Sequence, residues 1–529
     1  MEMPTINEVL AVEKIQLPTP SDSSLTMSWR KILRNMFGLD WRSLALMRMA
    51  LAGVILLDLA IGAQHLAAFY TDDGVLPRAD LIALANPVFS LHLISGSWWW
   101  AAGLFGLEAL SALMMLVGYR TRLATAVCWF LLVSRQARNP LLLFGSDIVL
   151  RVAMFWAMFL PLNRRLSLDA AWERVQAPTE SSYLGAAGFG AIVQFILIYV
   201  ISGVLKSDPV WWVDHTAVYY ALSIDIYSRP LGAWLNQYDG VTALLTVCTL
   251  YLEIYGPVLF ILPIASAWGR LVGFVLFVGL QVGFAITMQM GLFWVVMIAF
   301  NLMFLPAEFW NWLPKPVDRF EHWWRFSANS FFSLRVTFKN RPINQPSLPP
   351  PDRFLTRILR RGSSLVRDAG LLALALVIVF YNIDTVPGHA PLLPRRLSAL
   401  VEDLGLDQYY NMFAPSPQTV DGWYVLRAWL QNGRNVDLRT GATATFAKPD
   451  SVADTYGDEI NASLLIDLTF DDYTPYREDY CRYLARQWNQ NHPSAEQVKT
   501  LEMIFLQQVN GPAHTKSAPT PILLWTENF

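Results

Sequence analysis

Long apolar runs recur along this chain of 529 residues, and they restrict its fold more than any other feature of the sequence. A helix needs about 17 to 25 mostly apolar residues to cross the hydrocarbon core of a bilayer. Such runs, some of them shorter, occupy residues 44–67, 98–118, 123–133, 149–162, 185–205, 241–263, 271–288, 291–306 and 369–381. The sequence therefore predicts a polytopic α-helical membrane bundle of about nine transmembrane helices.

The composition supports a membrane protein and argues against several classes of soluble protein. Hydrophobic residues make up 54% of the chain, and the formal net charge is only -2. A chain without a large excess of positive charge is not expected to bind nucleic acid. The three cysteines and seven histidines show neither a disulfide framework nor the spacing of metal ligands. No metal site is predicted.

Successive connections between the apolar runs are alternately rich and poor in lysine and arginine. This alternation predicts how the chain is oriented in the membrane. Loops rich in lysine and arginine stay on the cytoplasmic side of a membrane. Such residues cluster at 30–42, 120–122, 164–174 and 306–368, whereas the connections at 71–74 and 206–209 are acidic or poor in basic residues. We therefore expect an integral protein of the plasma or inner membrane, with a cytoplasmic N-terminus and an extracytoplasmic C-terminal domain.

The apolar spans and the basic segments divide the chain into five regions. They are a cytoplasmic tail at 1–41, a transmembrane core at 42–306, a basic cytoplasmic segment at 307–368, a last transmembrane helix at 369–386, and a small α+β extracytoplasmic domain at 387–529. In the tail, apolar residues from Trp29 to Phe37 recur at helical spacing between basic residues and predict an interfacial helix. The basic segment contains a proline-rich linker at 341–352.

Turn and strand signals are clear in the exterior domain. The run 423–430, the dipeptide Asn432–Gly433 and the run 436–438 predict a β-hairpin with a type I′ turn. Two later stretches, 476–490 and 494–508, have helical composition, and the second begins with a Ser-Ala-Glu start. We expect a hairpin followed by two helices.

Several charged residues fall in or beside the apolar runs, where charges are costly and usually face the protein interior. They are Asp58, Glu108, Glu253, Arg135, Asp147 and Arg151. We expect them to form one buried ionic network, and the alternative is that they simply hold helices together. Carboxylates at mid-bilayer depth also leave a transporter possible.

Lys206 stands at the outer end of the run 185–205 and is followed closely by Asp214 and His215. An amine held away from water gives up its proton more readily and can act as a base at neutral pH. The alternative is that the side chain extends to the membrane interface, as lysines at helix ends commonly do. The sequence leaves both possibilities open.

Several stretches resemble the horizontally transferred transmembrane (HTTM) domain, the membrane core shared with vitamin K-dependent gamma-carboxylase. They are 69–78 (FYTDDGVLPR), 138–141 (RNPL), 202–206 (SGVLK), 216–222 (TAVYYAL) and 291–293 (GLF), and they match in order over roughly residues 42–306. The predicted exterior domain also resembles relatives in this family, at 409–415 (YYNMFAP) and 421–423 (DGW).

The resemblance implies that Lys206 is the base that deprotonates a reduced quinone, vitamin K hydroquinone in the carboxylase, where oxygenation then yields a strong base that takes a glutamate γ-proton. The other predicted site residues are His215 and Asn139 as catalytic, and Arg138, Arg151 and Glu253 as cofactor-binding. The chain departs from the carboxylase at Leu205, at Pro140 and at Gln281. It therefore resembles the wider family better than the carboxylase itself.

Three functions follow as hypotheses. The leading one is a quinone- or lipid-linked modifying enzyme at the outer membrane face, with Lys206 as base. The second is a non-catalytic membrane anchor or scaffold whose exterior domain recruits an extracytoplasmic protein partner, and the third is a transporter. Membrane lipids are partners in all three.

Overall fold

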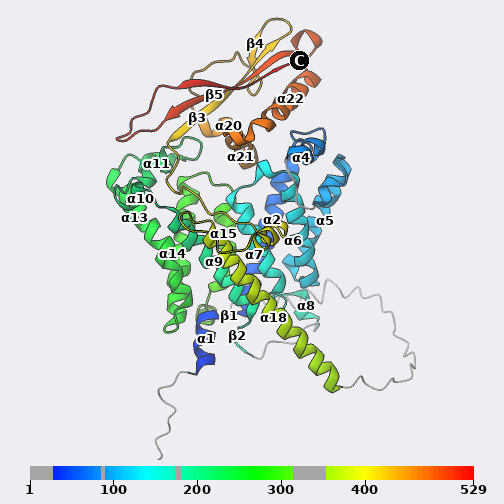
Figure 1. Ribbon diagram of the computed structural model, residues 1–529, viewed down its shortest axis with the longest axis vertical. Coiled ribbons are helices and arrows are strands. Elements are labelled where there is room, and N and C mark those ends of the chain that lie inside the picture. The colour runs from blue at the N-terminus through cyan, green and yellow to red at the C-terminus, as the bar shows by residue number, and fades with distance from the viewer. Residues whose placement is uncertain (1–27, 85–89, 173–179, 314–352) are drawn as a thin grey trace, which may run out of the picture.

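The computed structural model describes residues 28–84, 90–172, 180–313 and 353–529. In this part of the chain a bundle of helices carries a β-sheet at one end (Figure 1). Six helical segments are long and apolar enough to cross a membrane: Trp41–Gln64 (α2), Trp98–Val117 (α5), Ala186–Leu205 (α9), Asp239–Ile261 (α13 with the 3-10 turn η3), Ser266–Thr287 (α14) and Ser364–Asp384 (in α18). The chain has the helices of an integral membrane protein.

The other three predicted spans are also helical, but they do not meet the same limits of length and apolarity. They are Thr121–Arg138 (α6), Gly145–Phe159 (α7), and Phe293–Asn301 (α15) with the 3-10 turn Leu302–Phe304 (η4). α6 packs against α5 and α7, and α15 packs against α2, α7 and α14. The described residues thus contain six helices that are both long and apolar enough to span a membrane, and the other three pack against members of this set.

α9 lies at the centre of the bundle, in contact with α7, α13 and α18. Its Phe195 packs edge-on against Phe260, Phe277, Phe300 and Phe304, with ring centroids 4.9 to 6.2 Å apart. Offset and edge-on aromatic pairs add stability beyond the area they bury. This aromatic cluster joins α9 to η3, α14, α15 and η4, and it holds the central helix in place.

The predicted interfacial helix is present as Trp29–Phe37 (α1), at the end of the bundle far from the sheet (Figure 1). Its Trp29 side chain is 79% exposed. Residues 1–27 and the predicted proline-rich linker at 341–352 lie outside the described residues. The last long helix, Arg353–Asp384 (α18), begins sixteen residues before the predicted start at 369, because the basic stretch continues the same helix.

The C-terminal region confirms the predicted hairpin but not its type I′ turn, because that turn needs a positive φ at both Asn432 and Gly433, and of the two only Gly433 has one. Its sheet has four antiparallel strands in the order β4-β3-β5-β6, which are Asn435–Asp437 (β4), Val420–Leu430 (β3), Val498–Val509 (β5) and Thr520–Asn528 (β6). Between β3 and β4, Gly433 has a φ of 81°, a conformation that glycine adopts without strain. The helices are Arg395–Asp403 (α19), Val452–Tyr456 (α20), Glu459–Asp467 (α21) and Thr474–Asn491 (α22), and α22 confirms the helix predicted at 476–490.

The helix predicted at 494–508 is wrong. Ser494–Glu496 forms a single 3-10 turn, and Val498–Val509 is a strand. This strand pairs with β3 from Val498 to Val509 and with β6 on its other side. Pairing on both edges satisfies the backbone of β5 and outweighs the weak helical preference of its residues.

The C-terminal region rests on the end of the bundle that carries the short helices Arg78–Leu84 (α4), Pro209–Trp212 (α10), Ala217–Ser223 (α11) and Pro230–Leu235 (α12). Arg486 of α22 donates to the carbonyl of Gly74 at 3.0 Å, and Tyr219 of α11 donates to the carbonyl of Gly511 at 2.7 Å. The C-terminal region therefore contacts the bundle directly.

Candidate functional site

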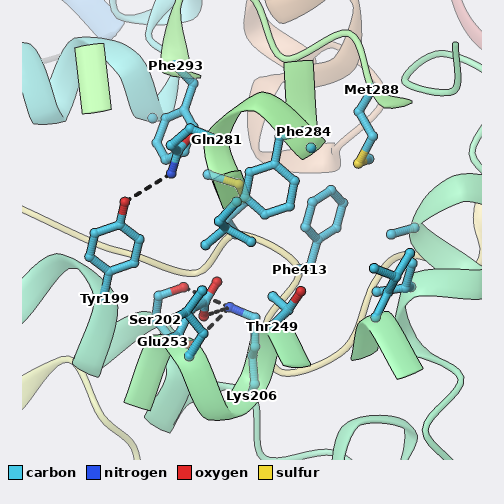
Figure 2. Close-up of a pocket in the computed structure, with 18 of the residues that line it drawn as sticks. Tyr199, Ser202, Lys206, Thr249, Glu253, Gln281, Phe284, Met288, Phe293 and Phe413 are labelled. Carbon is cyan, nitrogen blue, oxygen red and sulfur yellow. Dashed lines mark hydrogen bonds and ion pairs between the residues drawn. The ribbon is translucent and has the colours of Figure 1, made fainter. Parts of the chain in front are cut away.

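Lys206 caps the end of α9 and is buried, with 2% of its surface exposed. Its Nζ donates to Ser202 Oγ at 2.8 Å and forms an ion pair with Glu253 Oε2 of α13 at 2.6 Å (Figure 2). The ring of Trp211 lies 5.2 Å from the same nitrogen. The side chain is therefore held inside the protein and does not extend to the membrane interface.

Gly203 explains why Lys206 and Glu253 meet. A Cβ added to Gly203 would lie 2.5 Å from Ile254 Cγ1 and 3.4 Å from Glu253 Cβ. Small residues in membrane helices allow two backbones to approach closely. The glycine thus lets α9 and α13 cross in contact, one turn below the lysine.

A cavity of about 440 Å³ lies beside this ion pair. Tyr199, Ser202 and Lys206 line it from one face of α9, because positions three and four apart share a helix face. Glu253 lines it from α13. The remaining wall is mostly apolar and comes from α7, α10, α11, α12, α13, α14, α15 and residues 409–413, including Phe284, Met288, Phe293, Met412 and Phe413. Volumes of about 300 to 1,000 Å³ are typical of small-molecule sites.

Gln281 of α14 adds a second polar group to this cavity. Its Nε2 donates to the hydroxyl of Tyr199 at 3.0 Å (Figure 2). Its Oε1 is buried and has no hydrogen-bond partner among the described residues. A buried acceptor without a donor costs about 1 to 3 kcal/mol. Gln281 therefore places an unsatisfied polar atom in the wall of the cavity, beneath the atoms that face the empty space.

The segment after α18 forms one wall of the cavity, and a buried amide cluster fixes it. Gln194 of α9 donates to Gln408 Oε1 at 2.7 Å and to the hydroxyl of Tyr410 at 3.1 Å. Asn382 of α18 also donates to Gln408 Oε1, at 3.1 Å. Trp211 Nε1 donates to the carbonyl of Phe413 at 3.2 Å. The cavity is therefore completed by residues far away in the sequence.

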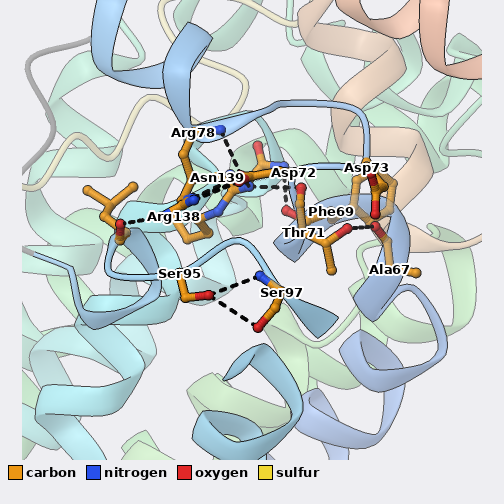
Figure 3. A network of polar contacts seen from close by, with 12 residues as sticks. Ala67, Phe69, Thr71, Asp72, Asp73, Arg78, Ser95, Ser97, Arg138 and Asn139 are labelled. Atoms are coloured by element: carbon orange, nitrogen blue, oxygen red, sulfur yellow. Dashed lines mark hydrogen bonds and ion pairs between the residues drawn. The ribbon is translucent and has the colours of Figure 1, made fainter. Parts of the chain in front are cut away.

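Arg138 and Asn139 lie elsewhere, at the end of α6 (Figure 3). Arg138 donates to the carbonyl of Thr71 at 3.0 Å, and Asn139 donates to the carbonyl of Phe69 at 3.2 Å. In the same loop Arg78 forms an ion pair with Asp72 at 2.7 Å, and its hydrogen bonds lower the pKa of Asp72. Two of the stretches singled out in the sequence, 69–78 and 138–141, are thus brought together as a loop anchor.

Arg151 and His215 also lie outside the cavity lining. Arg151 of α7 donates to the carbonyl of Asp407 at 3.0 Å and to its Oδ1 at 3.1 Å, which ties α7 to the segment after α18. His215 is half-buried, has a φ of 53°, and places Nδ1 3.1 Å from the carbonyl oxygen of Trp211. Of the six predicted site residues, the structure brings Lys206 and Glu253 to one cavity.

The single network expected from the sequence is found in part among the described residues. Asp58, Arg135 and Asp147 line one small pocket, and Glu108 pairs with Arg135. Glu253 and Arg151 lie elsewhere and have other partners. Arg135 pairs with Glu108 at 3.2 Å and with Asp58, and it joins α2, α5 and α6. Asp147 accepts a hydrogen bond from the backbone of Phe144 at the start of α7. The nearest pocket to Arg135 has a volume of about 40 Å³.

Sequence reasoning missed Tyr199, Ser202 and the wall at 409–413 as parts of the site. The spacing of Tyr199, Ser202 and Lys206 is a usable signal, because it predicts a polar stripe along an otherwise apolar helix. No comparable signal links 409–413 to this helix. Comparisons with protein-family models, with curated proteins and with solved structures find no match to this chain.

Proposed function

We propose that this protein is a membrane enzyme that removes a proton from a quinone- or lipid-linked substrate, with Lys206 as the base and Glu253 as its partner. One observation carries the proposal: a buried lysine–glutamate pair, 2.6 Å apart, lines an apolar cavity of about 440 Å³. Perturbed or desolvated ionisable groups in a concave pocket are the usual signature of a functional site.

The pair can move protons without an external base. In the proposed first step one proton passes from Nζ to Glu253 Oε2, across the hydrogen bond of 2.6 Å that joins them, and leaves both groups neutral. The free lone pair of Nζ then accepts the proton of a ligand hydroxyl, which leaves an oxyanion beside the new ammonium group. Glu253 retains the first proton, so all protons are accounted for.

A reduced quinone of the vitamin K type suits these residues. Lys206 and Gln281 would hold hydroxyl groups on the ring, and Phe284, Phe293 and Phe413 supply aromatic surfaces beside it. When bound, such a group supplies redox chemistry that no side chain here provides. The resemblance to the HTTM family and its carboxylase agrees with this role, because Lys206 occupies the position of the proposed base.

The proposal includes a topology of nine crossings, in which α6, α7 and α15 also traverse the bilayer. An odd number puts α1 and the C-terminal sheet on opposite sides, which agrees with their places at opposite ends of the bundle (Figure 1). We propose that the N-terminus is cytoplasmic and the sheet extracytoplasmic, in a plasma or inner membrane. Cysteine accessibility of Cys-substituted α1 and β6 in sealed vesicles tests this sidedness.

The decisive experiment uses the full chain in lipid nanodiscs and a naphthoquinol with an isoprenoid tail. We expect the wild type to bind the quinol and consume it in the presence of oxygen, and Lys206→Met to bind it without consuming it. Lys499→Met is the matched control, because Lys499 is exposed in β5. Consumption by Lys206→Met at the wild-type rate would remove the mechanism, and binding without turnover by the wild type would favour a non-catalytic protein.

A non-catalytic anchor is the second candidate, and one observation favours it. A cleft of about 520 Å³ lies between the bundle and the C-terminal region, lined by Asp225, Lys448, His514 and Lys516. A polar cleft of this size suits a segment of an extracytoplasmic protein partner or substrate. Charge-reversal at Lys448 that abolishes partner capture while quinol binding persists would support this candidate.

A further inference from the structure

The wall of the cavity between α13 and α14 is formed partly by residues that are exposed at the surface of the bundle. Cys248 of α13 and Gly279 of α14 line the cavity and are also exposed. Two larger apolar residues share both properties, since Leu245 is 37% exposed and Ile286 is 50% exposed. Residues that border a cavity and also the outer face of the bundle mark an opening between the two helices.

Two glycines keep this opening clear. Gly279 and Gly283 lie one turn apart on α14, and a Cβ on either would meet no atom of another described segment within 4 Å. Lower on the same helix, Gly273 is packed, because its Cβ would lie 3.1 Å from the ring of Phe260. Small residues normally bring membrane helices together. At Gly279 and Gly283 they leave a gap instead.

The inner end of the cavity is polar and its opening is apolar, and this difference indicates what kind of ligand fits. Inside are the Lys206–Glu253 pair and the unpaired acceptor Oε1 of Gln281, while the opening is bordered by apolar side chains and glycine. A soluble charged molecule would lose its hydration at the opening without compensation. An amphipathic ligand fits both ends.

We infer that α13 and α14 form a lateral entrance at Gly279 and Gly283, through which the ligand reaches the cavity from the bilayer and in which its hydrocarbon tail remains. The inference rests on the proposed function and adds the route by which its substrate enters. Aromatic side chains around the cavity face the ring, and membrane lipid receives the end of the tail.

Filling the opening tests the inference. Gly279→Leu places a side chain in open space, so the fold should persist while the passage closes. In nanodiscs we expect this variant to weaken binding of a naphthoquinol with a four-unit isoprenoid tail by about tenfold or more, and binding of the same ring without a tail by less than about twofold. Gly103→Leu is the control, because Gly103 of α5 is also exposed and has open space at its Cβ.

Cys248 provides a second measurement on the unmodified protein. Of the three cysteines, Cys248 is exposed, whereas Cys128 and Cys481 are buried. A membrane-permeant maleimide should label Cys248, and the tailed quinol should slow this labelling by about tenfold, whereas the tail-less ring should not.

The outcomes separate the opening from the chemistry. If the tailed quinol binds and Gly279→Leu binds it equally well, with unchanged labelling of Cys248, the opening is refuted and the role of Lys206 stands. If the wild type binds neither quinol, both proposals fall. If both quinols lose affinity equally in Gly279→Leu, the substitution has damaged the cavity and the tail does not lie there.

Discussion

Two buried ionic centres of the bundle look alike in sequence and differ in their surroundings. Lys206 with Glu253 borders a cavity of about 440 Å³, whereas Arg135 with Asp58 and Glu108 borders one of about 40 Å³. Both consist of a cation and carboxylates on apolar helices. The difference shows that the Lys206 centre has space for a ligand beside it, whereas the Arg135 centre chiefly joins three helices.

The two cations suit these different roles. The planar guanidinium of Arg135 presents separate donors to Asp58 and Glu108 and so joins three helices at once. The ammonium of Lys206 is a compact group that can give up its proton. Substitutions at each centre test this contrast.

Loss of Lys206 should remove activity and leave the fold. We expect Lys206→Met to lower quinol consumption by about 10² to 10⁴-fold, the range that general acid–base catalysis contributes. The double variant Lys206→Met with Glu253→Gln avoids leaving an unpaired carboxylate and should unfold close to the wild-type temperature. Equal loss of folded protein in both variants would show that the pair is structural, like the Arg135 centre.

Loss of Arg135 should instead destabilise the fold. Arg135→Met leaves two carboxylates buried without a counter-ion, and breaking a buried pair costs about 3 to 5 kcal/mol. Thermal unfolding in detergent should show this loss of stability. Adding Asp58→Asn and Glu108→Gln should restore much of the stability. Normal stability of the single variant, with lost turnover, would give the Arg135 centre a chemical role.

Gly203 should be needed for the pairing of Lys206 with Glu253. A valine there would collide with Ile254 and push α9 from α13, and such overpacking costs about 1 to 3 kcal/mol. We expect Gly203→Val to lose quinol affinity together with stability, measured by binding and by thermal unfolding. Gly106→Val on the exposed face of α5 is the control, and equal behaviour of the two variants would refute a close helix crossing.

A third ionic centre lies outside the membrane segments and should respond to pH. Asp421 of β3 accepts a hydrogen bond from the backbone of Asp225 at 2.7 Å. Burial, and then the nearby charge of Asp225, raise the pKa of Asp421 from 3.8 to about 6. The folded state therefore holds this proton more tightly than the unfolded state, so stability should fall as pH rises from about 4 to about 6.

Asp421→Asn should flatten this dependence. We expect a change on the order of 1 kcal/mol across that range, because the pKa of the neighbouring Asp225 is lowered by its lysine partners and its ionisation changes stability in the opposite direction. Thermal unfolding between pH 4 and pH 7 measures it. A wild-type stability that rises with pH over this range, or an unchanged profile in Asp421→Asn, would contradict the assignment.

Local patterns were enough to predict much of the fold. Apolar length identified the spans, and the Asn432–Gly433 turn identified the β3–β4 hairpin. Local patterns failed where pairing between segments far apart in the sequence determined the secondary structure. The residues 498–509 became a strand because β3 and β6 pair with both of its edges, and α18 began early because its basic residues continue a helix that the apolar span already stabilises.

The sequence by itself determined that the chain enters a membrane and that Lys206 stands at the end of an apolar helix, because hydropathy and helix length are local properties. Tertiary structure alone decided that Glu253, 47 residues away, is its partner, that Gln281 faces the same space, and that residues 409–413 close it. A cavity exists only between packed segments, and those contacts depend on how separate helices cross rather than on any one of them.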